Sequence, residues 1–331
     1  MRRREFISLI GGAALAGPFA AHGQSQERVR RIGVLIPLSE SDAEAQNEIR
    51  AFRDGLRRLG WIANRNVKFD IRWAAGDVGL IQSYAKELVG LQPDAILART
   101  TPVTAVLLQE TRSIPIVFVG PSDPVGAGFV ASMARPGGNA TGFTNVEASL
   151  GGKWVEMLKE IDPHIARIAV IYDPKTSPGG GSFYLRLVEE AAKSIAAEVV
   201  RVQIHDADEV SRAIQKFARD PSGGLLVQPD VTTHNNRALI ISMAARYRLP
   251  AVYAYPYYVD EGGLAAYGVD VVDLYRRAAT YVDRILRGEK PDQLAVQAPA
   301  KFRLAINLKA AKALDLIVPL TLLARADEVF E

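Results

Sequence analysis

Three short apolar segments occur twice in this chain, in the same order and at similar spacing. The matched pairs are residues 31–36 and 167–172, 95–97 and 224–226, and 114–118 and 249–253. Each segment is apolar almost throughout rather than alternating, which is typical of a parallel strand that is buried on both faces. Amphipathic helical patterns lie between them, such as the stripe formed by Ile49, Phe52 and Leu56. This alternation predicts an α/β fold with a doubly wound sheet in each half of the chain.

Segments near the C-terminus do not fit a plain tandem of two such domains. After the second set of strands come a further strand at 262–267, an amphipathic helix that ends at Gly288, and a strand-like run at 302–306. We therefore expect the chain to cross between the halves more than once, so that a hinge of several connections joins two lobes of like topology. The expected first lobe is 24–145 with 262–292, and the expected second lobe is 146–261 with 293–331.

The composition excludes several classes of protein and site. The 331 residues contain no Cys, which excludes disulfide scaffolds, thiolate metal sites and Cys nucleophiles. Lys and Arg number 40 against 37 Asp and Glu, and this near balance leaves no basic footprint for nucleic acid. His164, His205 and His234 occur singly, and no H-E-x-x-H or G-x-S-x-G motif is present. We therefore expect no metal, no cofactor and no catalytic residue, and we expect His234 to be a solvated residue at a helix start.

The first 23 residues have the three parts of an export signal. Arg2, Arg3 and Arg4 form a basic start, an apolar stretch follows at 6–21, and small residues stand at the expected cleavage site. Arg3 and Arg4 resemble the pair of a twin-arginine signal, and an ordinary secretion signal is the alternative. The segment predicts a mature chain that starts near Gln24 and is free in the periplasm, without a lipid anchor because no Cys follows.

Ligands of open α/β sheets bind beyond the carboxyl ends of the strands, so the residues that follow each strand are the candidate ligand contacts. In the first lobe these are Ser39, Thr100, Thr101, Ser122 and Asp123, and in the second lobe they are Tyr172, Asp230, Tyr253, Tyr255 and Tyr257. Thr101 before Pro102 predicts a helix N-cap, where free N–H groups could receive a carboxylate. Asp123 and Asp230 could receive an ammonium group.

Tyrosines are dense between residues 253 and 267, where five occur. Their rings are suited to stacking on a planar or aromatic ligand. A Tyr-rich hinge that packs on itself would have the same sequence, so both interpretations stay open.

A glycine-rich stretch at 126–131 (GAGFVA) matches the spacing of a dinucleotide-binding fingerprint. That fingerprint needs a tight turn that leads directly from a strand into a helix. Pro121 and Pro124 stand between the preceding strand and these glycines. We therefore do not expect NAD to bind here.

Four stretches of the chain resemble a known family, the substrate-binding proteins of bacterial ABC transporters that include tryptophan- and tyrosine-binding members. They are 98–105 (ARTTPVTA), 114–128 (IPIVFVGPSDPVGAG), 135–143 (RPGGNATGF) and 305–314 (AINLKAAKAL). The resemblance covers nearly all of the mature chain. It implies a two-lobed fold of the periplasmic binding protein type I class, which closes around a small solute and delivers it to a permease in the inner membrane.

The resemblance also points to particular site residues, namely the turn at 100–102, Ser122 with Asp123, and the turn that holds Asp230. Amino-acid-binding members tend to have Asp-Asn in that last turn, whereas this chain has Asp230-Val231. We therefore expect a monomeric solute-binding component of an ABC importer, with an aromatic amino acid or an aromatic carboxylate as its solute. A periplasmic sensor or adaptor for such a solute is one alternative, and an exported α/β enzyme that uses a nucleotide or sugar is another.

Overall fold

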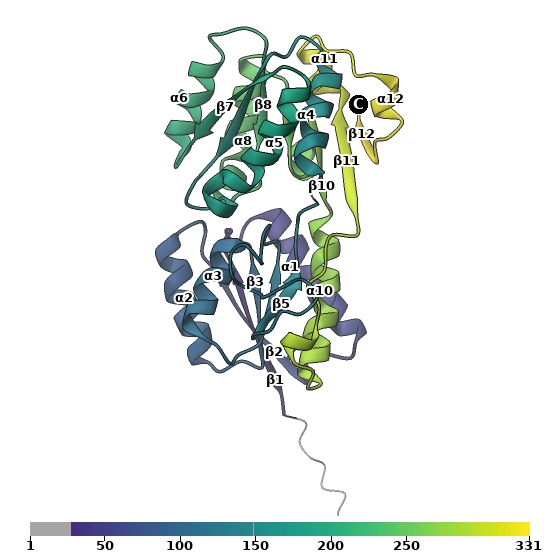
Figure 1. Cartoon of the computed structure of the whole chain (residues 1–331). Helices are drawn as coiled ribbons and strands as arrows, with labels where there is room; N and C mark the ends of the chain where they lie inside the picture. Colours follow the sequence, from purple (N-terminus) through teal and green to yellow (C-terminus); the bar gives the residue numbers. More distant parts are fainter. Residues whose placement is uncertain (1–27, 148) are drawn as a thin grey trace, which may run out of the picture.

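The computed structural model describes residues 28–147 and 149–331, and it forms two lobes that are each built around one sheet (Figure 1). The expected export signal, with Arg3 and Arg4, lies outside the described residues. No helix in the described ranges is both long enough and apolar enough to cross a membrane.

The first lobe has a sheet of five parallel strands in the order β2-β1-β3-β4-β5. The strands are β1 (Arg30–Ile36), β2 (Val67–Trp73), β3 (Ala95–Arg99), β4 (Ile116–Val119) and β5 (Ala140–Phe143). Its helices are α1 (Ala43–Arg58), α2 (Val78–Gly90), α3 (Thr101–Glu110) and α10 (Val271–Leu286), together with the short 3₁₀ helix η2 (Pro291–Gln293). Helices α2 and α3 cover one face of this sheet, and α1 and α10 cover the other (Figure 1).

The second lobe has a sheet of seven strands in the order β12-β11-β10-β9-β8-β6-β7. The strands are β6 (Arg167–Tyr172), β7 (Glu198–Gln203), β8 (Gly223–Val227), β9 (Ala251–Tyr253), β10 (Ala265–Val269), β11 (Phe302–Asn307) and β12 (Glu328–Phe330). Its helices are α4 (Leu150–Ile161), η1 (Pro178–Gly181), α5 (Ser182–Ser194), α6 (Ala207–Phe217), α7 (Val231–Asn235), α8 (Arg237–Arg246), α9 (Tyr257–Asp260), α11 (Leu308–Ala313) and α12 (Leu320–Leu323). Only the β10–β11 pair is antiparallel among these described strands.

The two sheets repeat one topology, as the sequence predicted. Strands β7-β6-β8-β9-β10 of the second sheet follow the same order as β2-β1-β3-β4-β5 of the first. The three matched pairs of apolar segments correspond to β1 and β6, β3 and β8, and β4 and β9. The expected fold class, two doubly wound α/β lobes of like topology, is therefore confirmed.

The chain passes between the described parts of the lobes three times, after β5, before α10 and before β11. The second and third passages differ from the expected boundaries. Strand β10, which we expected in the first lobe, pairs with β9 and β11 in the second sheet. Gln297, expected in the second lobe, donates its backbone N–H to the carbonyl oxygen of Gly142 in β5 at 2.9 Å. A short apolar strand fits either sheet, so its sequence alone does not show which sheet it joins.

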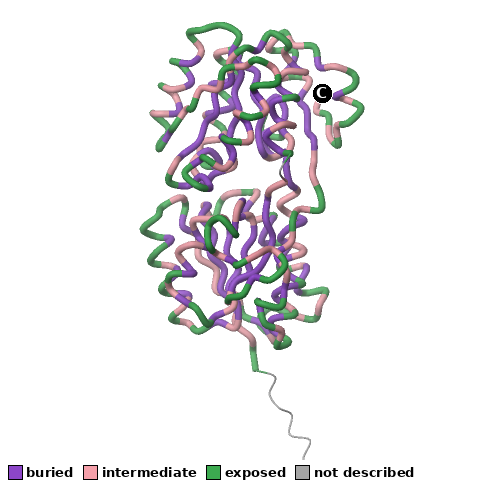
Figure 2. Tube along the Cα trace, viewed as in Figure 1, coloured by how far each residue is buried: buried purple, intermediate pink, exposed green. Residues whose placement is uncertain are grey.

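The inner strands of each sheet are buried on both faces, and the exposed positions lie mostly on the outer helices, the turns and edge strands such as β7 (Figure 2). Helix α10 belongs to the first lobe although the strands before and after it in sequence, β10 and β11, belong to the second, and it packs closely along α1. Gly55 on α1 makes this approach possible, because a Cβ atom there would lie 2.7 Å from the Cβ of Ala279. The first lobe is therefore completed by a segment from late in the chain.

Candidate functional site

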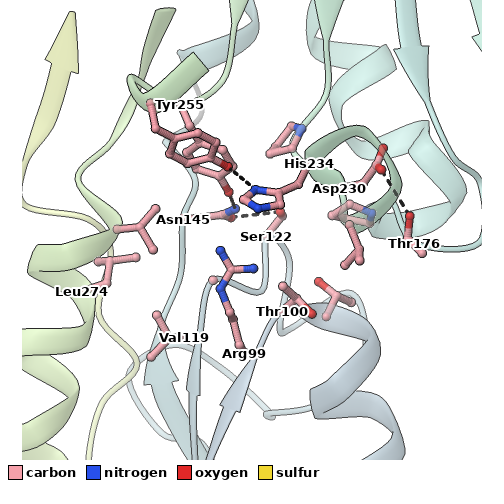
Figure 3. A pocket seen from close by; sticks show the side chains of 17 residues that line it. Arg99, Thr100, Val119, Ser122, Asn145, Thr176, Asp230, His234, Tyr255 and Leu274 are labelled. Carbon is pink, nitrogen blue, oxygen red and sulfur yellow. Dashed lines mark hydrogen bonds between the residues drawn. The ribbon is translucent and has the colours of Figure 1, made fainter. Parts of the chain in front are cut away.

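A cavity lies between the two lobes, at the carboxyl ends of β3, β4 and β8 (Figure 3). Within its boundary about 560 Å³ is free of protein atoms, and part of this space is open to solvent. The residues that line it are Arg99, Thr100, Thr101, Val119, Gly120, Ser122, Asn145, Thr176, Pro178, Pro229, Asp230, Val231, His234, Tyr255, Tyr257, Val271 and Leu274. Both lobes contribute walls, so the position agrees with the general place of ligand sites in open α/β sheets.

The first-lobe wall contains an unpaired hydroxyl group. Thr100 connects β3 to α3 with a φ of 75°, which is rare for a β-branched residue and strains the backbone. Thr100, rather than Thr101 as expected, is the N-cap, and its side chain makes no capping hydrogen bond. Its Oγ1 is buried and has no hydrogen-bond partner among the described residues. This hydroxyl and the first N–H group of α3, on Thr101, are therefore available to a ligand.

Arg99, the last residue of β3, forms the floor of the cavity, and its guanidinium points toward Ser122 and Asn145 (Figure 3). Its Nε and Nη2 donate to the two carboxylate oxygens of Glu48 on α1, at 2.7 and 2.8 Å. Both side chains are more than nine-tenths buried. A bidentate pair of this kind uses two of the five N–H groups of the guanidinium.

Hydrogen bonds cross between the lobes at the back of the cavity. Ser122 donates its hydroxyl to Asn145 Oδ1 at 2.9 Å, and its oxygen lies 2.9 Å from the hydroxyl of Tyr184 on α5. Asn145 in turn donates from Nδ2 to the hydroxyl of Tyr255 at 3.0 Å. These contacts join first-lobe strand ends to two tyrosines of the second lobe, so the lobes are held together around the cavity.

Asp230 is the N-cap of α7, and its carboxylate accepts four hydrogen bonds. Oδ1 accepts from the Thr233 N–H at 2.8 Å and from Thr176 Oγ1 at 3.3 Å. Oδ2 accepts from the Asp173 N–H at 3.1 Å and from Ser177 Oγ at 2.8 Å. Burial raises the pKa of Asp230 to about 6, although the hydrogen bonds from Thr233, Asp173 and Ser177 lower it. The carboxylate therefore holds the turn after β8 in place.

His234, which we expected to be solvated, is buried between the lobes with 3% of its surface exposed. Its Nε2 lies 3.0 Å from Asp42 Oδ2 of the first lobe, and its Nδ1 lies 2.8 Å from the Tyr257 hydroxyl. Burial lowers the pKa of His234, and the charge of Arg99 acts in the same direction. The neutral ring therefore donates from Nε2 to Asp42 and accepts at Nδ1 from Tyr257.

The tyrosines pack on one another and also reach the cavity. Tyr255 stacks on Tyr257 with ring centroids 5.3 Å apart, and Tyr253 stacks on Tyr258 at 4.8 Å. Tyr257 and Tyr258 stack at 5.2 Å, which joins the two pairs. Only Tyr255 and Tyr257 of this described cluster line the cavity. The self-packing interpretation is therefore confirmed, and stacking of Tyr255 or Tyr257 on a ligand stays a prediction.

Six of the ten expected contacts line this cavity, namely Thr100, Thr101, Ser122, Asp230, Tyr255 and Tyr257. The other four lie elsewhere. Ser39 bonds to Ser41 near the end of β1, and Asp123 caps the Gly126 N–H in a neighbouring hollow. Tyr172 and Tyr253 point into the cores on the two faces of the second sheet.

Several cavity residues were not expected from the sequence. Arg99 is the last residue of β3 and Asn145 follows β5, so the strand-end rule would have included both if charged and amide groups had been weighed equally with hydroxyls. His234, Val271 and Leu274 reach the cavity only because the lobes meet there. Within the described ranges, no group of three or more His, Asp or Glu side chains is placed to hold a metal ion.

A family model described as ABC transporter substrate binding protein matches residues 31–330. The tyrosine-binding protein of Clostridioides difficile (strain R20291) is 29% identical over 292 residues, which are 88% of this chain and 82% of that protein. The structure is similar to that of a conserved domain protein from Vibrio cholerae, with a TM-score of 0.85, 28% identity, and coverage of 91% of this chain and 100% of that one. It also shares its fold with an ABC domain from Streptococcus pneumonia in complex with L-Trp, with a TM-score of 0.84, 23% identity, and coverage of 91% and 99%.

Proposed function

Because the chain belongs to the family of ABC transporter substrate-binding proteins, as its sequence motifs predicted, we propose that it is the solute-binding component of an importer. It closes two lobes around a small solute and delivers that solute to a permease in the inner membrane. The observation that carries this proposal is the cavity itself, whose walls come from strand ends of both lobes. The three passages of chain between the lobes support it, since they form a hinge on one side of the cavity.

The lining of the cavity indicates a solute with a carboxylate end and an apolar body. Arg99, Thr100 and Thr101 offer donors at the end of β3. Tyr255, together with Val271, Leu274 and other apolar residues, offers rings and alkyl groups. An amino acid or an aromatic carboxylate has both parts. The tyrosine-binding relative and the L-Trp complex of similar fold agree with this chemistry.

The proposal places the mature protein in the periplasm as a monomer. Its support is the sequence of residues 1–23, which has the parts of an export signal, with Arg3 and Arg4 as the twin-arginine pair. A periplasmic location is also where a protein that feeds an inner-membrane permease must work.

A thermal-shift screen of the chain from Gln24 onward tests the proposal. Amino acids, aromatic acids and nucleotides are compared, each at a large excess. A solute bound only by the native state adds RT ln(1 + [L]/Kd), which is about 4 kcal/mol at a thousandfold excess over Kd. We expect one class of small acid to raise the melting temperature strongly and nucleotides to leave it unchanged. A shift caused only by NAD or another nucleotide would contradict the proposal.

A further inference from the structure

The cavity contains a carboxylate that an ammonium group cannot use. Each oxygen of Asp230 already accepts two hydrogen bonds, from Thr233 and Thr176 on one side and from Asp173 and Ser177 on the other. A carboxylate has about four lone-pair positions, so this one has none left. An ammonium group placed beside it would have to displace a donor that holds the turn.

The other acceptors around the cavity do not replace this carboxylate. Asp230 is the only acidic residue among the described residues that line the cavity. Asn145 Oδ1 accepts one hydrogen bond, from Ser122, and the Tyr257 oxygen is bonded to His234, but neither oxygen carries a negative charge. Val231, directly after Asp230, presents an alkyl group to the cavity and is buried. An ammonium group buried here would lack a charged partner, which is unfavourable.

Donors for an anion are available on the first-lobe wall of the cavity. The Oγ1 of Thr100 is buried without a partner, and the backbone N–H of Thr101 is in the first turn of α3. Arg99 lines the same wall and commits only Nε and Nη2 to Glu48. A carboxylate at this wall would receive hydrogen bonds from a hydroxyl, a backbone amide and a guanidinium.

From this asymmetry we infer that the solute is a carboxylate without an ammonium group, such as an arylalkanoate, and not an α-amino acid. The inference rests on the proposed function and narrows its solute class. The carboxylate lies at Thr100 and Arg99, and the carbon that carries the ammonium group in an amino acid lies against Val231 and Tyr255.

Matched pairs of compounds test this inference by titration calorimetry. The pairs are L-tryptophan with 3-(indol-3-yl)propanoate, L-tyrosine with 3-(4-hydroxyphenyl)propanoate, and L-phenylalanine with 3-phenylpropanoate. In the pairs that bind, we expect the acid to bind at least about tenfold more tightly than its amino acid. Equal or tighter binding of the amino acid would overturn the inference and leave the solute-binding function intact. If no compound of either kind binds to the folded protein, the carboxylate solute itself is wrong, and the inference falls with it.

A variant at Thr100 tests the position of the carboxylate. Thr100→Val keeps the shape of the side chain and removes the unpaired hydroxyl, so affinity for the bound acid should fall about tenfold. Thr100→Ser should restore most of the affinity, and Ser39→Ala, which removes a hydroxyl outside the cavity, should change nothing. A Thr100→Val protein that binds the acid as tightly as the parent chain would overturn the inference.

Discussion

Asp42 Oδ2 of the first lobe and His234 Nε2 of the second lie 3.0 Å apart, and they link the lobes beside the cavity. The same oxygen lies 3.0 Å from Arg237 Nη1, while Oδ1 caps α1 by accepting from the Ala45 N–H at 2.9 Å. The pKa of Asp42 is lowered because the hydrogen bond and charge of these partners outweigh the effect of burial. One carboxylate thus connects the start of a first-lobe helix to two groups of the second lobe.

Asp42→Asn should favour the open arrangement of the lobes. The substitution removes the charge that Arg237 faces and should weaken closing by about 1–2 kcal/mol, which is about tenfold in solute affinity. Titration calorimetry measures the affinity, and small-angle scattering measures the radius of gyration without solute. Asp77→Asn is the matched control, because Asp77 caps α2 in the same manner, accepting from the Leu80 N–H, on an exposed surface. Equal affinities of the two variants would show that the contacts of Asp42 with His234 and Arg237 do not hold the lobes closed.

Acid should destabilise the protein through His234. Because burial lowers the pKa of His234 in the folded state, the unfolded chain binds a proton below about pH 6.5 that the native chain does not bind. The free energy of unfolding should therefore fall as the pH is lowered from about 6.5 toward the native pKa. His234→Gln should reduce this slope between pH 6.5 and 5, whereas His164→Gln, at an exposed position, should not. Urea denaturation at several pH values measures the slope of the free energy of unfolding against pH. Identical slopes for the parent chain and His234→Gln would show that His234 does not cause the pH dependence.

Asp230→Ala should destabilise the solute-free protein. Four donors lose their acceptor, and a buried donor without a partner costs about 1–3 kcal/mol. The hydroxyls of Thr176 and Ser177 can rotate toward water, so the two backbone N–H groups dominate and a total loss of about 2–6 kcal/mol is expected. The control is Asp206→Ala, because Asp206 caps α6 through the Glu209 N–H at an exposed site. That cap should contribute about 1 kcal/mol. A melting temperature equal to that of the parent chain would show that Asp230 serves the solute instead of the turn.

The repeated strands allowed the fold to be predicted because a buried parallel strand is recognisable from its own residues. The positions of the lobe boundaries depended on long-range pairing. Strand β10 is apolar on both faces and would satisfy either sheet, and its neighbours β9 and β11 select the second. Such pairing is a property of the assembled sheet, which no local pattern in 265–269 reveals.

The candidate site was predicted best where the backbone leaves a strand. Thr100, Ser122 and Asp230 follow β3, β4 and β8, and all three reach the cavity. Tyr172 and Tyr253 are the last residues within β6 and β9, so the alternation of the strand directs them into the core faces instead. His234 was missed because its burial comes from Asp42 in the other lobe, 192 positions away in the sequence.

The buried pair of Arg99 and Glu48 has two roles that substitutions can separate. Arg99→Met leaves the Glu48 carboxylate buried without its partner, so the free energy of unfolding should fall by about 3–5 kcal/mol. In the double variant Glu48→Leu/Arg99→Met neither position carries a charge, so no unpaired charge is buried there. Most of the lost stability should return, to within about 1–2 kcal/mol of the parent chain.

Solute binding should not return with stability. The double variant lacks the guanidinium that lines the cavity, so its affinity for a carboxylate solute should remain at least about tenfold below that of the parent chain. Chemical denaturation and calorimetry on the same samples give the two quantities. If the double variant regained both stability and affinity, Arg99 would serve only to neutralise Glu48. Loss of affinity in a protein of restored stability means that the same guanidinium also holds the solute.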